Sequence, residues 1–304
     1  MKTPSRLFKW SNINLLTEMV LLVICVMTVW IPAGNAAQTG DFDYFKLVQI
    51  PGIKDQQLLH IILDDEIYKF CKDDYSDVRL FDSKKNEVPA QITQKKSSDT
   101  DAGGFASKDY SVQSFDVSRD EKTGLTLVHI KTNREPLVGF RLSIEEAFTP
   151  GSVKVETLQG ETWEVLGAKV DPADGDTSIS VIFEENRARE YRLNIETGNM
   201  SNLLVKDVTG VGNVYSLVYF GELGSAYQLF WGGDGLRKPN YDTKAIQAQL
   251  ASGASMKRAR IGRGFQNPDK GKAQEEVGSN FLNSKLFLAI LLIGFLLVVG
   301  SALV

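Results

Sequence analysis

The sequence predicts a mainly β protein with two antiparallel β-sandwich domains and one C-terminal transmembrane helix. Short apolar or alternating runs recur along the chain between turn residues, and no helix-period segment of ten residues precedes about position 242. This spacing is typical of antiparallel sandwiches. Residues 286–304 carry no charge, which is the pattern of a membrane-spanning helix. We therefore expect a strand-rich body held by a terminal membrane helix.

The N-terminal 37 residues have the layout of an export signal. Lys2, Arg6 and Lys9 precede an apolar stretch at 19–31, and small residues follow at 33–37. A basic start, a short apolar segment and a small-residue cleavage zone direct a chain out of the cytosol. We expect 1–37 to be such a signal or an uncleaved anchor, and the body to lie in the periplasm.

The first sandwich domain is expected over residues 38–118. Its strands are predicted at 44–50, 58–63, 78–81 and 88–92, with a strand or one helical turn at 65–70 and a long polar loop at 95–105. Cys71 is the single thiol outside the export signal, so no internal disulfide is available to this domain. We expect Cys71 to be buried, with pairing to a partner protein as the alternative.

The second sandwich domain is expected over residues 119–232. Tyr191, Leu193 and Ile195 should share one face of a strand because side chains alternate across a sheet. Its predicted strands lie at 126–131, 138–144, 152–157, 162–166, 178–183, 189–195 and 203–208.

Two motifs in this second domain resemble the discoidin-like, galactose-binding jelly roll. They are Val153-Lys154-Val155-Glu156, which leads through a turn to Trp163, and the later strand A-R-E-Y-R-L at 188–193. The resemblance implies a jelly-roll sandwich, with Trp163 expected in the core. Relatives of this kind often hold a structural calcium or bind sugars through loops at one end.

The chain as a whole resembles an uncharacterised family of Gram-negative envelope proteins, known as domain of unknown function 3999. The residues that carry this resemblance are V-R-L-F-D at 78–82, V-P-A-Q-I at 88–92 and Y-Q-L-F-W-G at 227–232. Relatives usually have basic residues after the terminal span, and this chain has none. Because the family has no assigned activity, the resemblance implies location and architecture only.

The sequence carries no recognisable catalytic motif. His60 and His129 are its only histidines, and both lie in apolar, strand-like runs. Histidine is the commonest general base, and we expect His129 to point into the core with Leu125 and Leu127. Adjacent carboxylates such as Asp73-Asp74 are expected to be solvated turns. We therefore predict no enzyme, no catalytic residue and no cofactor.

Ligand and metal sites are also expected to be absent. Residues 171–176 are rich in Asp and Gly, but their spacing departs from that of a calcium loop, and a hairpin turn is the preferred interpretation. Arg134 and Arg187 could bind an anionic group in bidentate fashion, although we expect solvated side chains. The net charge of −4 indicates no nucleic-acid partner.

The remaining segments are a linker at 233–284 and the membrane helix at 285–304. A short amphipathic helix is expected at 241–250, followed at 252–284 by a flexible polar tether. Its basic cluster, which is Lys257, Arg258, Arg260, Arg263, Lys270 and Lys272, could touch anionic lipid headgroups. Small residues of the span offer a surface for a membrane partner; they are Gly294, Gly300, Ser301 and Ala302.

We thus expect a non-catalytic accessory protein of the inner membrane that faces the periplasm. Its partners would be the inner membrane, another integral membrane protein or an envelope polysaccharide. A periplasmic carbohydrate- or ligand-binding module is the alternative, and a glycan hydrolase is the third possibility.

Overall fold

The computed structural model describes residues 37–95, 106–148, 150–171, 177–197 and 203–272. The described residues from Gln38 onward belong to one compact unit. The expected export signal, the membrane span, nearly all of the loop at 95–105 and most of the possible calcium loop lie outside the described residues. Within the described ranges, no helix has the length and apolar character needed to cross a membrane.

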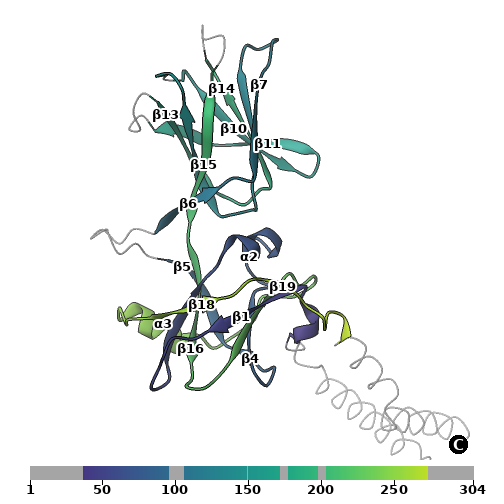
Figure 1. Cartoon of the computed structure of the whole chain (residues 1–304), viewed down its shortest axis with the longest axis vertical. Coiled ribbons are helices and arrows are strands. Elements are labelled where there is room, and N and C mark those ends of the chain that lie inside the picture. Colours follow the sequence, from purple (N-terminus) through teal and green to yellow (C-terminus); the bar gives the residue numbers. More distant parts are fainter. Residues whose placement is uncertain (1–36, 96–105, 149, 172–176, 198–202, 273–304) are drawn as a thin grey trace, which may run out of the picture. The chain divides into compact units, whose positions relative to one another are not determined.

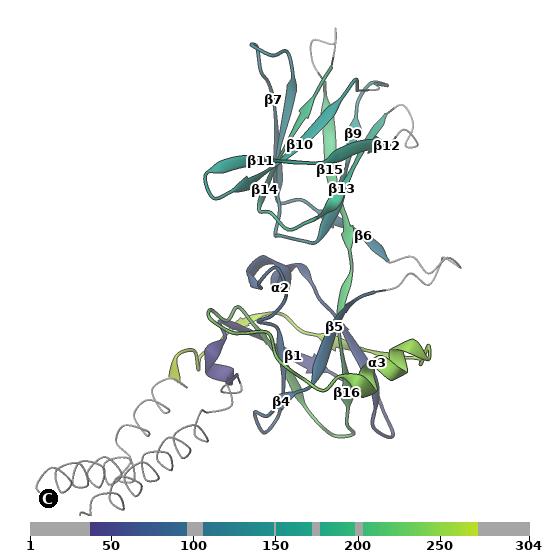
Figure 2. The same ribbon diagram turned by 180° about the vertical axis from the view of Figure 1, so that it is seen from behind.

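Strands arranged in three sheets are the predominant regular structure of the described chain, as predicted for a mainly β protein (Figures 1 and 2). The nine-stranded sheet has the order β4 (Glu87–Val88), β3 (Arg79–Asp82), β17 (Tyr227–Trp231), β1 (Tyr44–Gln49), β18 (Lys257–Ile261), β2 (Gln57–Ile62), β16 (Tyr215–Gly221) and β5 (Ala90–Gln94), with β19 (Phe265–Gln266) beside β1.

The two five-stranded sheets form a sandwich. One has the order β11 (Thr162–Leu166), β10 (Val153–Gln159), β14 (Glu190–Ile195), β8 (Thr126–Lys131) and β7 (Ser114–Arg119). The other has the order β12 (Ala168–Asp171), β13 (Ser178–Asn186), β9 (Leu137–Ile144), β15 (Val205–Asn213) and β6 (Ser107–Ser111).

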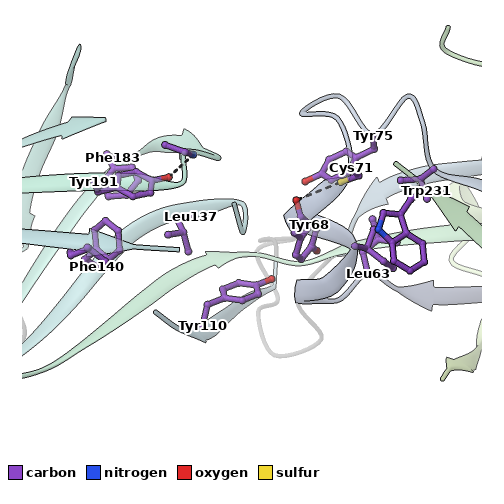
Figure 3. Close-up of a cluster of buried hydrophobic side chains, with 14 of the residues drawn as sticks. Leu63, Tyr68, Cys71, Tyr75, Tyr110, Leu137, Phe140, Phe183, Tyr191 and Trp231 are labelled. Atoms are coloured by element: carbon purple, nitrogen blue, oxygen red, sulfur yellow. Dashed lines mark hydrogen bonds between the residues drawn. The ribbon is translucent and has the colours of Figure 1, made fainter. Parts of the chain in front are cut away.

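The sandwich core confirms the predicted alternation of β14. Tyr191, Leu193 and Ile195 are each 0% exposed. Phe140 of β9 meets Tyr191 edge-on across the sandwich, with ring centroids 5.0 Å apart (Figure 3). Burying each such side chain stabilises the fold by about 1.5–3 kcal/mol. The three apolar side chains on one face of β14 therefore favour the orientation in which that face points into the core.

The sandwich is inserted into the nine-stranded sheet along the sequence. Strands β6 and β7 precede the expected boundary at 118 but pair with sandwich strands. Strands β16 and β17 precede the expected boundary at 232 but pair with β2, β5, β1 and β3. The consecutive domains 38–118 and 119–232 are therefore not the units in which the strands pair, because strand pairing connects β5 to β16 across the whole insertion.

The first expected sandwich is a single sheet, and the expected tether at 252–284 contributes two of its strands. Strand β18 pairs in parallel with β2 and antiparallel with β1, and β19 also pairs with β1. Ala259 of β18 is 1% exposed while Lys257 and Arg258 face outward. The tether prediction is wrong for 257–266 because the high charge of this stretch concealed its inward-facing Ala259.

Two short helices complete the fold. Residues 65–70, for which the sequence left open a strand or a helical turn, form the helix α2 (Asp65–Phe70). Asp64 caps this helix by accepting a 3.3 Å hydrogen bond from the Ile67 amide. Helix α3 (Lys244–Ala251) confirms the predicted short helix and buries Ile246 against β2 and β16. The 3-10 turn η1 spans Thr39–Asp41.

Candidate functional site

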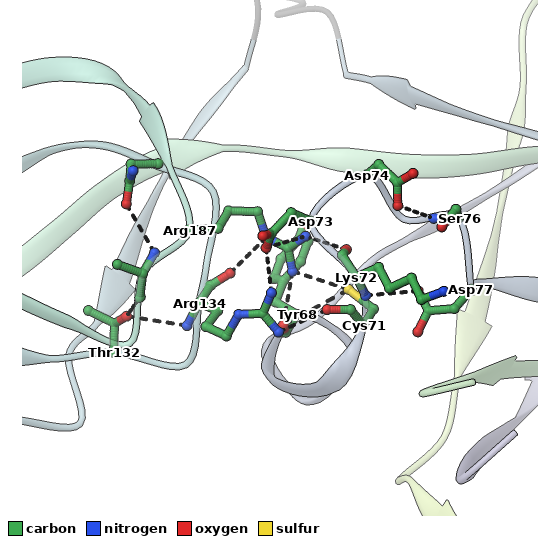
Figure 4. A network of polar contacts seen from close by, with 12 residues as sticks. Tyr68, Cys71, Lys72, Asp73, Asp74, Ser76, Asp77, Thr132, Arg134 and Arg187 are labelled. Carbon is green, nitrogen blue, oxygen red and sulfur yellow. Dashed lines mark hydrogen bonds and ion pairs between the residues drawn. The ribbon is translucent and has the colours of Figure 1, made fainter. Parts of the chain in front are cut away.

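Arg187 joins the sandwich to the segment that follows α2. Its side chain is 5% exposed and donates to the carbonyl oxygens of Lys72 at 2.7 Å and Tyr68 at 2.9 Å (Figure 4). Its Nε also donates to the Arg134 carbonyl at 3.0 Å. A guanidinium has five donors in a fixed planar arrangement, so one side chain satisfies backbone groups from both regions.

Arg134 makes a second connection between the same regions. It donates from Nη1 to the Cys71 carbonyl at 2.9 Å and pairs through Nη2 with Asp73 (Figure 4). Its backbone adopts the left-handed region, with φ of 62°, a conformation that L residues adopt rarely. The two arginines singled out in the sequence thus contact protein groups, and neither is a solvated side chain at a loop rim.

Cys71 is buried between these arginines, as predicted. It is 0% exposed, and its Sγ accepts a hydrogen bond from Arg187 at 3.1 Å. Burial raises the pKa of the Cys71 thiol to about 11, even though Arg187 opposes the shift. A thiol in such a setting is protonated and unreactive at neutral pH.

A concave pocket of about 360 Å³ lies beside this junction, and we call it the tyrosine pocket. Tyr75 reaches it from the loop after α2, Tyr215 from the start of β16, and Tyr241 from the segment before α3. The other lining residues include polar and charged side chains: Asp74, Ser76, Arg79, Gln91, Lys238, Asn240, Thr243 and Gln247. Small-molecule sites have volumes of about 300–1,000 Å³, so this pocket is large enough for a small ligand.

Tyr75 occupies the pocket wall in a strained conformation. Its φ is 56°, and such conformations cost about 1–3 kcal/mol for a residue other than glycine. Its ring is 4.9 Å from that of Tyr215, and the Arg187 guanidinium lies 4.5 Å from its centroid. The ring is also part of the aromatic cluster that includes Tyr68 and Tyr110 and continues toward the sandwich core (Figure 3).

Three buried polar atoms of the residues that line this pocket have no hydrogen-bond partner among the described residues. They are the hydroxyl oxygen of Tyr75, the Oε1 of Gln91 and the Nε of Arg79, of which only the Arg79 Nε has an ion-pair partner, Glu87. Leaving such a group buried and unpaired costs about 1–3 kcal/mol. Most buried polar groups in proteins are paired with protein or water. The Tyr75 and Gln91 oxygens have neither a hydrogen bond nor an ion pair among the described residues, and a molecule in the pocket would pair with them once a small movement of these side chains exposes the two atoms.

Arg79 lines the tyrosine pocket and is held in place by Glu87. Arg79 is 2% exposed and its Nε lies 2.8 Å from the Glu87 carboxylate, which also accepts a hydrogen bond from the Tyr241 hydroxyl. Arg79 Nη2 donates to the Arg237 carbonyl at 2.7 Å. The buried charge is thus paired inside the protein, and Tyr241 is fixed in position.

The sandwich residues noted in the sequence lie on the outer face of a sheet. Trp163 is half-buried there, with the Arg192 guanidinium 4.4 Å from its ring centroid and the His129 ring at 5.6 Å. His129 pairs with Glu190 at 2.9 Å. Both core predictions are wrong. His129 faces outward because Thr126, Val128 and Ile130, the alternate set on β8, face inward. Trp163 of β11 packs beside His129 and Arg192 on that same outer face.

Glu156 forms the centre of an ion cluster on the same outer face. It accepts from Arg192 Nε at 2.7 Å and from Asn194 at 2.9 Å, and it lies 2.6 Å from Lys154 Nζ. Burial favours the protonated acid, but these donors outweigh burial and lower the pKa of Glu156 to about 2. The cluster is thus ionised and fully occupied by protein groups.

Sequence reasoning missed every residue of the tyrosine pocket. Tyr75, Gln91, Tyr215 and Tyr241 come from segments far apart in the chain, and no spacing rule brings them together. The sequence features near these residues indicate local structure only, such as the Asp-rich turn around Tyr75. In the described part of the chain no group of three or more His, Cys, Asp or Glu side chains has the geometry to hold a metal ion.

Comparisons with known proteins add distant structural likenesses only. No family model matches the chain, and no curated protein matches it. The module CBM32-3 from a family 31 glycoside hydrolase of Clostridium perfringens is 12% identical, with 52% of this chain and 100% of that chain covered at a TM-score of 0.20.

A rhamnosidase from Novosphingobium sp. PP1Y is 11% identical, with 71% of this chain but 28% of that chain covered at a TM-score of 0.20. The likeness to a CBM32 domain agrees at a distance with the jelly-roll resemblance of the sequence, whereas membership of domain of unknown function 3999 has no matching family model. At these TM-scores, neither likeness carries an argument about function.

Proposed function

We propose that this protein is a non-catalytic binding protein of the bacterial envelope, and that the tyrosine pocket holds a small neutral saccharide. The observation that carries the proposal is the pair of unpartnered polar atoms, Tyr75 hydroxyl and Gln91 Oε1, at a concave pocket lined by three tyrosines. Tethering by residues 286–304 would place this pocket in the periplasm.

The chemistry of the lining fits a sugar. A saccharide presents apolar C–H faces to aromatic rings and hydroxyl groups to polar side chains. Tyr75, Tyr215 and Tyr241 supply rings, while Gln91 and Asn240 supply amides. Amides both donate and accept hydrogen bonds, which suits hydroxyl groups better than a fixed charge does.

The same lining favours binding over hydrolysis. Glycoside hydrolysis ordinarily requires two carboxyl groups on either side of the scissile bond. Asp74 is the single carboxylate among the described lining residues of the tyrosine pocket, and its Oδ1 accepts from the Ser76 amide at 3.0 Å. Burial raises the pKa of Asp74, but the Ser76 hydrogen bonds outweigh it and the net shift is downward, so Asp74 is a poor proton donor.

The proposal is tested by removing the Tyr75 hydroxyl. Without ligand, Tyr75→Phe should leave stability unchanged or slightly raised, because a buried unpaired hydroxyl is removed. With ligand, one hydrogen bond worth about 0.5–1.5 kcal/mol is lost, so affinity should fall about two- to tenfold. Tyr219→Phe is the matched control, because the Tyr219 hydroxyl is also buried and unpartnered among the described residues but does not line this pocket.

The measurement is a glycan-array screen of the full chain, followed by titration calorimetry with the best neutral saccharide. Weaker binding in Tyr75→Phe, with normal binding in Tyr219→Phe, supports the proposal. Absence of any saccharide binding, or an equal loss in both variants, contradicts it. Cleavage of the bound glycan would contradict the non-catalytic assignment.

A further inference from the structure

A second concave site lies between α2 and the sandwich, and its lining is strongly basic. It has a volume of about 310 Å³, and we call it the basic pocket. Its cationic lining residues are Lys69, Lys131, Arg134 and Arg189, against Glu190 as the acidic lining residue described there. Four cations facing one carboxylate create a positive potential in a concave space, which attracts anions.

Three of these cations have no carboxylate partner among the described residues. Arg134 pairs with Asp73, but the structure records no ion pair for Lys69, Lys131 or Arg189. The Lys69 ammonium lies 5.3 Å from the centroid of the Phe70 ring. The positive charge of the basic pocket is therefore not neutralised by its own surroundings.

Glu190, the acidic residue of this lining, already has a partner within the protein. Glu190 Oε2 lies 2.9 Å from the Nε2 of His129 on the outer face of the sheet. Amide groups complete the lining: Gln113 donates to the side-chain oxygen of Asn133, which leaves the Asn133 side-chain NH₂ available as a donor. The basic pocket thus offers ammonium, guanidinium and amide donors.

Three segments hold these donors in place. Lys131 ends β8, Arg189 immediately precedes β14, and Lys69 lies in the last turn of α2. The end of β8 is held against the start of its neighbour β14, because the Thr132 amide donates to the Arg189 carbonyl at 2.9 Å and the Thr132 hydroxyl donates to the Ala188 carbonyl at 2.7 Å. Cations on fixed backbone bind an oxyanion at lower entropic cost than cations on free loops.

We propose that the basic pocket binds an oxyanion: a phosphate, sulfate or carboxylate group, either as a free ion or carried on a sugar. Arg189 would bind two oxygens in bidentate fashion, and Lys131 and Lys69 would contribute point charges. This site is separate from the tyrosine pocket, with which it shares no described lining residue. The proposal therefore does not depend on saccharide binding at the tyrosine pocket.

The test is titration calorimetry of the full chain at low ionic strength with inorganic phosphate, inorganic sulfate and glucuronate, and with glucose as the neutral comparison. We expect saturable binding of at least one anion. Any binding of glucose should be the same in the parent protein and in the Lys131→Ala, Arg189→Ala double variant, because a neutral sugar is assigned to the tyrosine pocket. Lys131→Ala with Arg189→Ala should weaken anion binding at least about tenfold, because two charge-assisted contacts are lost. Added salt should weaken the binding as well.

Lys244→Ala is the matched control, because Lys244 is also exposed and lies in α3 away from the basic pocket. It removes one positive charge and should leave anion affinity within twofold of the parent protein. A circular dichroism spectrum identical to that of the parent would establish that each variant folds.

The outcomes separate the sources of the anion. Binding of phosphate or sulfate that is lost in the double variant supports a free-ion site, and tighter binding of glucuronate supports an anionic sugar. No saturable binding of any of the three anions overturns the proposal, as does an equal loss in Lys244→Ala. Tyr75→Phe should leave anion binding intact, so failure of one pocket is distinguishable from failure of the other.

Discussion

Arg187→Ala is expected to weaken the connection between the sandwich and the nine-stranded sheet. The guanidinium is 5% exposed and donates to three carbonyl oxygens at distances of 2.7, 2.9 and 3.0 Å. Truncation removes the Arg187 donor from these three acceptors, of which the Lys72 carbonyl keeps a 3.1 Å hydrogen bond from the Tyr75 amide, and it opens space beside Tyr75 and Cys71. The 3.8 Å ion pair with Asp73 adds little, because the Asp73 side chain is 73% exposed.

The expected cost follows from these contacts. Each buried acceptor that loses its partner costs about 1–3 kcal/mol, and water entering the new space recovers part of that cost. We therefore expect Arg187→Ala to lower the free energy of unfolding by about 3–5 kcal/mol, as is typical when one partner of a buried charged network is removed. Arg187→Lys should recover only part of this, because one ammonium group cannot reach all three carbonyls.

The assay is urea unfolding of the full chain followed by circular dichroism, with hydrogen exchange of the segment at 65–78 as a local readout. Arg189→Ala is the control, because Arg189 is exposed two residues away and its removal should change stability by less than about 0.5 kcal/mol. Faster exchange at 65–78 should accompany the loss of stability in Arg187→Ala. A loss below about 1 kcal/mol, or one no larger than that of Arg189→Ala, would refute the reasoning.

Two further predictions follow from the titrating groups. Glu156→Gln should destabilise the protein at pH 7 but have a smaller effect at low pH. The folded-state pKa of Glu156, about 2, lies below its ordinary value of 4.5, so its stabilisation is present above pH 4.5 and is lost as the pH falls toward 2. Equal urea midpoint shifts at pH 7 and pH 3 would contradict this. Cys71 should resist a thiol-alkylating reagent in the native protein and react only on unfolding, as measured by peptide mass spectrometry; rapid native labelling would disprove its burial.

Much of the fold was predictable because strand formation leaves a local signature. The alternation in 189–195 predicts which side chains of β14 are buried, and Tyr191, Leu193 and Ile195 confirm it. The helix at 241–250 was predictable from its spacing for the same reason. Strand β8 was harder, because both of its faces carry apolar residues, and only the opposing sheet decides that Val128 is inside and His129 outside.

The candidate sites were not predictable from local patterns. The tyrosine pocket brings together Tyr75, Tyr215 and Tyr241. In the sequence, the whole inserted sandwich lies between Tyr75 and the other two tyrosines. Arg187 was noticed for its charge, but its role depends on carbonyl groups of a loop more than a hundred residues earlier. Such contacts have no signature in a single sequence.

The sequence by itself determined that the body is built from short antiparallel strands, that a helix of about two turns precedes the C-terminal region, and that Cys71 has no disulfide partner in the body. Tertiary structure alone decided that β5 and β16 pair across the inserted sandwich, and that 257–261 is a strand of the nine-stranded sheet. The physical reason is that period and composition are local properties of the chain. Strand partners and pocket walls are instead selected by the total burial and hydrogen bonding that distant segments achieve together.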